Sequence, residues 1–184
     1  MKRKLISPPE KEPVELVEAK AHLRIDHDYE DDLIYSMITA AREYCETMQK
    51  RVYLTQTWGL YMDHFKEEVT LPLPPLQSVN TVKYKDSDGL THELPNSEYD
   101  VDDVSEPSRL IFYNLPSVNL YRINPICIEI KVGHDHVDKV PKKIKQAILL
   151  LVAAWYENRE AFAPGQMNEI PFSVNALLWQ DRVF

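Results

Sequence analysis

A run of ten consecutive apolar residues, Ala147 to Tyr156 (AILLLVAAWY), is the feature that most constrains the fold of this chain. At 3.6 residues per turn, ten positions point in every direction around a helix, so a helix here needs cover on all sides. The run is too short to cross a bilayer, which takes about 20 apolar residues. We therefore expect protein to supply the cover, either from this chain or from a neighbouring subunit.

The composition suits a folded protein with an acidic balance. The chain has 184 residues, 44% of them hydrophobic, and a formal net charge of −8. A protein that grips DNA phosphates normally carries a basic surface, so this charge disfavours general DNA binding but allows DNA to slide past. Cys45 and Cys127 fall in a helical and a strand pattern, and we expect two buried thiols. The N-terminus lacks the apolar core of a secretory signal, so we expect synthesis in the cytoplasm and no membrane partner.

Helical periodicity occurs at both ends of the chain. Leu16, Ala19 and Leu23 share one face of a short predicted helix, and apolar residues from 33 to 48 recur at spacings of one, three and four in a second helix. Acidic residues between 26 and 32 lie at the predicted start of the second helix, where their carboxylates interact favourably with the positive end of the helix dipole. Pro141 is well placed to begin the third helix, which carries the apolar run.

Residues 52–132 read as β-structure, because β-branched and aromatic residues dominate and turn signals recur. The segment 126–132 alternates apolar and polar residues, and residues 79–94 read as a hairpin that turns at Asp88 and Gly89. The predicted class is α+β: a small helical platform of three main helices with an inserted antiparallel β domain of about six or seven strands. We expect a flexible arm (1–13), a platform (14–51 plus 137–160), a β domain (52–136) and a C-terminal tail (161–184).

The sequence offers no catalytic motif. None of the four glycines lies in a phosphate-binding or nucleophile-elbow turn. The segment Gly133-His134-Asp135-His136 places two imidazoles around a carboxylate, but nothing marks out a third or fourth metal ligand, so a polar connecting loop is expected. The carboxylates from Asp100 to Glu106 have no nucleophile or oxyanion donor near them. We therefore predict no enzymatic activity, no metal and no cofactor.

Six segments between about Pro13 and Glu160 stand in an informative order: PVELVEAKAHLRID, DDLIYSMITAAREYCE, QTW, LPLPPLQSVNTVKYKDSDG, YDVD and VPKKIKQAILLLVAAWYENRE. Their order and spacing resemble the head-tail connector, or adaptor, family of tailed bacteriophages and related prophages. The resemblance implies a non-enzymatic virion protein that assembles in the bacterial host cytoplasm. It implies a ring of about a dozen subunits beneath the portal, which extends the DNA channel without specific DNA binding and docks the tail or stopper protein.

The C-terminal tail carries a candidate partner interface. Leu177, Leu178, Trp179 and Phe184 stand in mostly polar surroundings, and aromatic anchors of this kind often carry interface energy. Two outcomes are open: the tail orders on a partner such as the portal, or it folds back on its own domain.

Two other functions are open alternatives. A ligand- or glycan-binding β module on a helical base predicts a concave aromatic pocket within residues 52–132. A metal-dependent hydrolase that uses His134, Asp135 and His136 ranks last.

Overall fold

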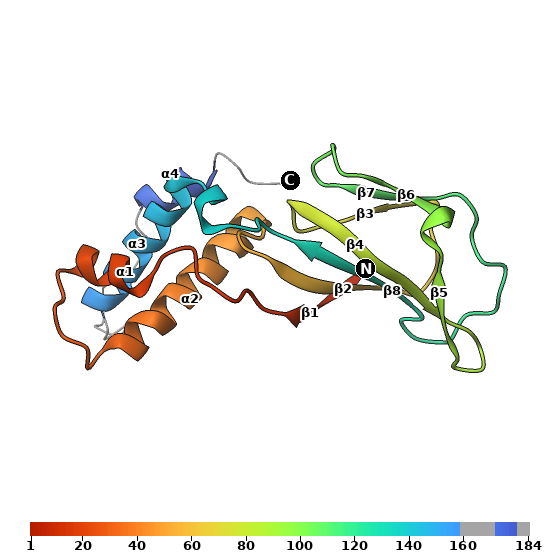
Figure 1. The fold of residues 1–184 in the computed structure, drawn as a ribbon, viewed down its shortest axis with the longest axis horizontal. Coiled ribbons are helices and arrows are strands. Elements are labelled where there is room, and N and C mark those ends of the chain that lie inside the picture. The colour runs from red at the N-terminus through yellow and green to blue at the C-terminus, as the bar shows by residue number, and fades with distance from the viewer. Residues whose placement is uncertain (159–171, 180–184) are drawn as a thin grey trace. The chain divides into compact units, whose positions relative to one another are not determined.

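The chain forms two compact units, one built from β-sheets and one built from helices (Figure 1). The structure is a computed structural model, and it describes residues 1–158 and 172–179. Residues 1–10 and 55–135 belong to the β unit, and residues 11–54, 136–158 and 172–179 belong to the helical unit. The predicted α+β class is confirmed.

Within the described residues, the helical unit contains α1 (Leu16–Leu23), α2 (Asp31–Gln49), α3 (Lys142–Glu157) and α4 (Phe172–Trp179). Local signals set the helix ends. The Glu18 carboxylate accepts a hydrogen bond from the Glu15 N–H at 2.9 Å at the start of α1. Arg24 and Lys50 adopt left-handed φ angles of 59° and 55°, which end α1 and α2. Pro141 immediately precedes α3, as expected. None of these helices is long and apolar enough to cross a membrane.

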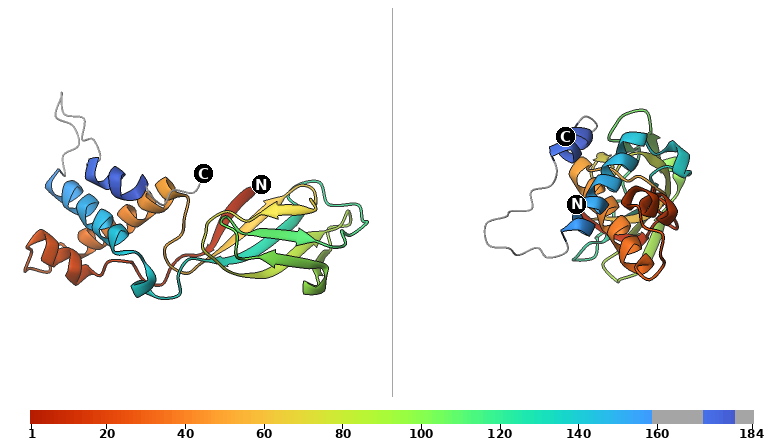
Figure 2. Two further views of the ribbon diagram at one scale, coloured as in Figure 1. Left: turned by 90° about the horizontal axis from the view of Figure 1, so that it is seen from above. Right: turned by 90° about the vertical axis from the view of Figure 1, so that its left-hand side faces the viewer.

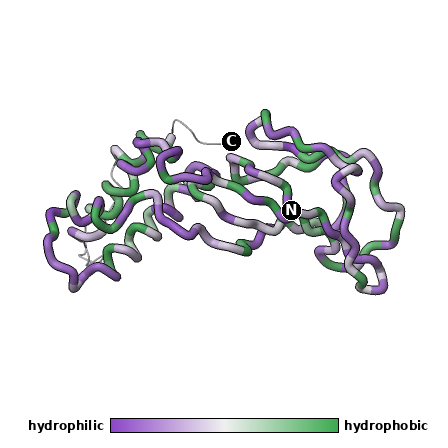
Figure 3. Tube along the Cα trace, viewed as in Figure 1, coloured by the Kyte–Doolittle hydropathy of each residue, from purple (hydrophilic) through white to green (hydrophobic). Residues whose placement is uncertain are grey.

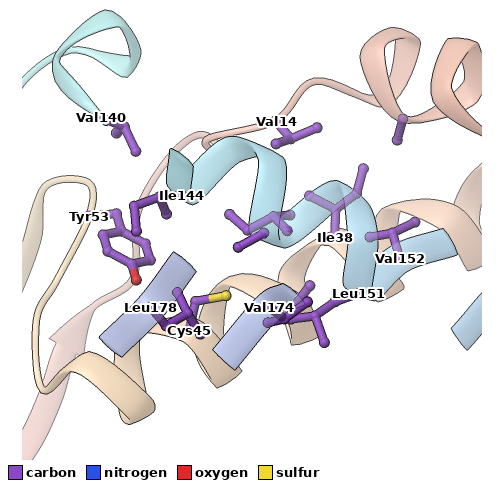
Figure 4. Close-up of a cluster of buried hydrophobic side chains, with 14 of the residues drawn as sticks. Val14, Ile38, Cys45, Tyr53, Val140, Ile144, Leu151, Val152, Val174 and Leu178 are labelled. Carbon is purple, nitrogen blue, oxygen red and sulfur yellow. The ribbon is translucent and has the colours of Figure 1, made fainter. Parts of the chain in front are cut away.

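The apolar run lies in α3, at the centre of the helical core (Figure 4). Ile148, Leu151 and Val152 are fully buried, and burial of each such side chain contributes about 1.5 to 3 kcal/mol as an upper estimate. Side chains of α1, α2 and α4 pack against them. Leu149 and Leu150 are only half-buried, because these helices wrap most but not all of the circumference of α3. The described helices of this chain therefore supply most of the cover that the apolar run requires.

A buried ion-pair network ties the chain segments of the helical unit to α2. The Arg42 guanidinium donates hydrogen bonds to Glu12 and Glu46 at 2.8 Å each, and its side chain is only 5% exposed. Glu46 also accepts the Tyr53 N–H at 2.9 Å. Burial alone would lower the pKa of Arg42, but the two carboxylates outweigh burial and raise it. The network thus fixes the chain where it enters the unit, before α1, and where it leaves, after α2.

Two antiparallel sheets make up the β unit (Figure 2). The five-stranded sheet has the order β1-β2-β8-β4-β5, and the three-stranded sheet has the order β3-β7-β6. The strands are β1 (Lys2–Ser7), β2 (Gln56–Met62), β3 (Glu68–Thr70), β4 (Leu76–Lys85), β5 (Thr91–Leu94), β6 (Tyr99–Asp102), β7 (Arg109–Phe112) and β8 (Ile126–Val132). Seven of these strands lie within residues 52–132, in agreement with the predicted six or seven.

The N-terminal residues differ from the prediction of a flexible arm. Lys2–Ser7 forms β1, which pairs antiparallel with β2 along the edge of the five-stranded sheet. All six residues of β1 are exposed, so the strand shows no alternation of apolar and polar residues that would reveal it. Its order comes from main-chain pairing with β2 instead. Charged side chains such as Lys2 and Lys4 are typical of exposed edge strands.

The core of the β unit follows from the alternation in β8. Ile126, Ile128 and Ile130 are fully buried, while the residues between them face the other side. Leu60 and Val82 lie directly opposite Ile128 on the two flanking strands, so they share its buried face. The hairpin between β4 and β5 turns through Gly89 at a φ of +85°, as its sequence predicted.

Candidate partner-binding surface

Helix α4 folds back onto the helical unit and covers part of α2 and α3 (Figures 2 and 4). Val174 and Leu178, four residues apart, lie on one face of α4 and are 0% and 2% exposed. They pack into the core cluster that contains Cys45 and Leu151. Burial raises the pKa of the Cys45 thiol to about 12, so it stays protonated at neutral pH. The described part of the C-terminal tail therefore folds back on its own domain, one of the two outcomes that the sequence left open.

A pair of buried hydrogen bonds anchors the end of α4 to the end of α2. The Gln49 amide donates a hydrogen bond to the Leu178 carbonyl oxygen at 2.7 Å, and the Tyr53 hydroxyl donates to the Gln49 amide oxygen at 2.8 Å. Gln49 is 1% exposed. The Leu178 carbonyl is one of the last four of α4 and has no partner within that helix, so Gln49 satisfies it.

An apolar pocket lies where α4 packs on the end of α2. Its volume is about 290 Å³, and Met48, Asn175, Leu178 and Trp179 line it. Trp179 is 62% exposed at one side of this pocket. The pocket therefore has the size and lining to take apolar side chains of another protein.

The predicted interface residues do not all lie on this surface. Trp179 is exposed, and Leu177 is half-buried against the core. The side chain of Leu178 is 2% exposed and belongs to the core, and it forms part of the inner wall of the pocket. Phe184 lies outside the described residues. The assignment of this segment to a partner stays a prediction.

Sequence reasoning missed two contributors to the surface. Met48 was assigned to the buried stripe of α2, and only the packing of α4 shows that it borders a pocket. Phe172 is 86% exposed at the start of α4. The sequence does carry a signal for Phe172: it is an aromatic residue that directly follows Pro171 and begins a short apolar segment.

The helical unit carries charges of opposite sign at the two ends of the α2–α3 pair. One end is the acidic loop, which we define as residues 26–32: the connection from α1 and the first two residues of α2. The Tyr156 hydroxyl near the end of α3 donates a hydrogen bond to Glu30 there. Lys20 of α1 forms ion pairs with Asp28 and Asp31 of this loop, at 2.5 and 2.7 Å. The bond with Asp28 and then that with Asp31 raise the pKa of Lys20, and the bond with Lys20 lowers that of Asp28.

The other end of the pair is the lysine end, which comprises Lys139, Lys142, Lys143 and Lys145. The first turn of α3 holds no acidic residue. Positive charge in the first turn of α3 interacts unfavourably with the helix dipole.

The motifs that suggested chemistry have structural roles. The Thr55 N–H donates a hydrogen bond to the His134 carbonyl oxygen at 3.0 Å, and the Gly133 N–H donates one to the Pro75 carbonyl oxygen at 2.8 Å. These two main-chain bonds close the end of the five-stranded sheet. Within residues 1–158 and 172–179, no group of three or more His, Cys, Asp or Glu side chains could hold a metal ion. Asp102 accepts hydrogen bonds from Ser105 and Arg109, which hold the pKa of its carboxyl well below the usual range.

Three aromatic side chains of the β unit pack against one another rather than around a pocket. The ring of Phe65 makes edge contacts with Tyr84 on β4 and with Phe112 on β7, each at 5.8 Å between centroids. Since β4 and β7 belong to different sheets, these rings fill the space where the sheets meet.

Comparisons with known proteins match the whole chain. Residues 13–122 and 124–182 match the family described as phage gp6-like head-tail connector protein. No curated protein matches the chain. A protein from the neck of an empty gene transfer agent (GTA) particle has a similar fold; that neck structure was computed with C6 symmetry. The TM-score is 0.83 and the sequence identity is 22%, and the alignment covers 100% of this chain and 96% of the GTA protein.

Two further solved structures have a similar fold. A protein of the virion of a native GTA particle gives a TM-score of 0.80 at 20% identity. A protein of the neck of a native GTA particle, computed with C12 symmetry, gives 0.75 at 21%. Both alignments cover 100% of this chain and 96% of the other.

Proposed function

The chain belongs to the phage gp6-like head-tail connector family, and on that premise we propose that it is the subunit of a connector ring beneath a portal. The family comprises structural phage connectors rather than enzymes. In the proposed role the chain extends the DNA channel, binds the portal on one side and docks a tail or stopper protein on the other. It acts at the head-tail junction of a virion that assembles in the bacterial host.

The observation that carries this proposal is the likeness of both units together to neck proteins of gene transfer agents. A match limited to the helices or to the sheets would be weaker support, since such elements recur in unrelated proteins. The C12 symmetry of one such neck favours about a dozen subunits.

The charges at the two ends of the α2–α3 pair support a head-to-tail ring. Such a ring requires two different, complementary faces on every subunit. The acidic loop and the lysine end have opposite charge and lie at opposite ends of the same helical pair. In the proposed ring, the acidic loop of one subunit contacts the lysine end of the next. The half-buried side of α3, with Leu149 and Leu150, adds apolar surface for a neighbour.

The surface of α4 is the proposed portal contact. Trp179 and the pocket beside Met48 provide an aromatic anchor and an apolar recess, features that carry much of the binding energy in protein interfaces. The acidic balance of the chain fits a channel in which DNA moves without being held.

Electron microscopy and mass measurement test the proposal. The full-length chain, alone and mixed with a purified portal ring of the same virus, is examined by negative-stain imaging and mass photometry. We expect rings of about a dozen subunits, either free or only on the portal. Absence of rings and of portal binding under both conditions would overturn the proposal.

A further inference from the structure

Lysine side chains gather on the outer face of the five-stranded sheet. Hydrophilic and hydrophobic residues alternate along strands of the β unit, so one side of the sheet is buried and the other faces outwards (Figure 3). The strand register shows which side chains share the outer side. We define the cationic sheet face by the charged residues on it: Lys2, Lys4, Lys83, Lys85, Lys131, Glu93 and Glu129.

These residues form one continuous surface, because the register joins them in rows across the sheet. Two neighbouring rows, in which each residue pairs with the next, are Lys2, Tyr61, Cys127, Lys83, Glu93 and Lys4, Gly59, Glu129, Thr81. A Cβ atom at Gly59 would lie 3.1 Å from the Tyr61 ring, so this ring lies directly over Gly59 and joins the two rows.

Positive charge dominates this face, although the chain as a whole is acidic. Five lysines and two glutamates lie on it, whereas the chain has a formal net charge of −8. Only one pair is compensated within the face, because Glu93 lies 3.8 Å from Lys83. Lys4 and Lys131 form no ion pair with any residue in the described part of the chain. Their charge is therefore available to an anionic partner.

The other charged residues of the face contact neutral groups. Lys2 donates a hydrogen bond to the Asn124 side chain at 3.2 Å, and the Lys85 ammonium lies 5.6 Å from the centroid of the Tyr121 ring. Glu129 accepts a hydrogen bond from a neutral side-chain amide at 3.0 Å. The face thus keeps a net positive charge that its own contacts do not cancel.

The opposite side of the β unit is acidic. The buried sides of the two sheets face each other, as the contacts of the Phe65 ring with both sheets show, so their outer faces point in opposite directions. Arg109, the one cation that the register places on the outer side of the three-stranded sheet, donates a hydrogen bond to Asp102 at 2.6 Å. We define the acidic sheet face by the charged residues on that side and the residue that follows β6: Glu68, Asp100, Asp102, Arg109 and Asp103.

We infer that the cationic sheet face of one subunit binds the acidic sheet face of a second copy of this chain. The inference rests on the proposed function, because a head-to-tail ring requires two different, complementary faces on each subunit. The β unit carries one face of each sign on its two sides, so identical copies can pair in this way around a ring. Duplex DNA suits the cationic sheet face less well, because Glu93 and Glu129 would lie against its phosphates.

Two charge-reversal variants and their mixture test the inference. The first combines Lys4→Glu with Lys131→Glu on the cationic sheet face, and the second combines Asp100→Lys with Asp103→Lys on the acidic sheet face. Mass photometry gives the fraction of chain in rings for each variant alone and for an equimolar mixture, with and without the purified portal ring. Thermal melting followed by circular dichroism establishes that both variants are folded.

The control variant combines Lys11→Glu with Lys66→Glu, which reverse two exposed lysines outside both faces and so match the first variant in net charge. We expect the control to form rings as the wild type does, while each face variant alone forms at least tenfold fewer rings. The mixture should return to within twofold of wild type. In a mixed ring the two variants can alternate, and every contact then joins faces of opposite charge.

Ring formation within twofold of wild type by both face variants would overturn the inference. A mixture that stays defective although both variants are folded would also overturn it, since the two faces then do not meet. Retention of a DNA duplex at low salt by the wild type but not by the first variant, with rings unchanged, would assign the cationic sheet face to DNA instead. A wild type that forms no ring, with or without the portal, would reject the proposed function and this inference with it.

Discussion

The side-chain amide of Gln49 in α2 donates a hydrogen bond to the main-chain carbonyl of Leu178 in α4 at 2.7 Å, across 129 residues of sequence. This bond lies in the buried core and links the part of the helical unit that precedes the β segment to α4 near the C-terminus. It makes α4 part of the folded unit rather than a free tail.

Replacement of Gln49 tests this linkage. We expect Gln49→Met to destabilise the helical unit by about 2 to 4 kcal/mol, because the Leu178 carbonyl and the Tyr53 hydroxyl both lose a buried partner. Urea unfolding followed by circular dichroism gives the free energy, and amide hydrogen exchange reports α4. Thr47→Ala, an exposed neighbour, is the control and should change stability by less than about 0.5 kcal/mol. Unchanged protection of α4 in Gln49→Met would contradict the linkage.

Arg42 is expected to be essential for folding of the helical unit. Arg42→Met leaves the carboxylates of Glu12 and Glu46 without their buried partner, and breaking such a network typically costs about 3 to 5 kcal/mol. Chemical denaturation of the full-length chain measures the loss. Glu43, which lies 3.6 Å from Arg42 and is 66% exposed, supplies the comparison: Glu43→Gln should cost less than about 0.5 kcal/mol. Similar losses for the two variants would refute the buried network.

The sequence predicted those elements whose pattern is local. The stripe of α2 and the alternation of β8 reflect burial on one face, which leaves a periodic signal. Strand β1 gives no such signal, because all its side chains are exposed and only pairing with β2 orders it. Helix α4 was missed because the sequence before it suggested an irregular tail.

The candidate surface was harder to predict than the fold. Trp179 was predicted as an interface residue because an aromatic residue stands out among polar neighbours, and the structure shows only that it is exposed. The inward orientation of Leu178 depends on its helical spacing from Val174, and the pocket beside Met48 forms only when α4 packs on α2. The apolar pattern indicated that distant helices pack together, but not which side chains, such as Met48 and Trp179, come to line one pocket.

Acid is expected to weaken the loop between β6 and β7 through Asp102. Its carboxyl has a lowered pKa because Ser105 and then Arg109 bond the charged form. Because the pKa of this carboxyl is lower in the folded than in the unfolded state, its charge stabilises the fold at pH values above the unfolded-state pKa of about 3.9. This stabilisation is lost as the pH falls below about 3.9 towards the folded-state pKa. The melting temperature of the wild type should therefore drop more between pH 5 and pH 3 than that of Asp102→Asn. Asp103→Asn, which removes one carboxylate at the adjacent exposed position, is the charge-matched control. Parallel curves for wild type and Asp102→Asn would rule out this role.

Charge reversal tests the proposed contact between subunits. The double variant Lys142→Glu with Lys145→Glu should lose ring assembly, because like charges would then meet the acidic loop of the next subunit. The monomer should be as stable as wild type or slightly more stable, since acidic residues suit the first turn of α3. Adding Asp26→Lys and Asp32→Lys to the same chain restores opposite charges and should restore rings, as measured by mass photometry. Rings that form equally well in the first variant would exclude this contact.

Trp179 and Leu178 are neighbours in α4 with opposite roles, and two substitutions separate them. Trp179→Ala removes an exposed side chain, so the fold should be unaffected while affinity for the purified portal ring falls about 30-fold, the equivalent of roughly 2 kcal/mol for an interface anchor. Leu178→Ala opens a cavity in the core and should destabilise the helical unit by about 2 to 5 kcal/mol. Biolayer interferometry measures portal binding, and thermal unfolding measures stability. Ser173→Ala, an exposed position on α4, controls for unspecific effects and should change neither quantity. Portal affinity that is unchanged in Trp179→Ala would remove α4 from the portal contact and leave it as a purely structural helix.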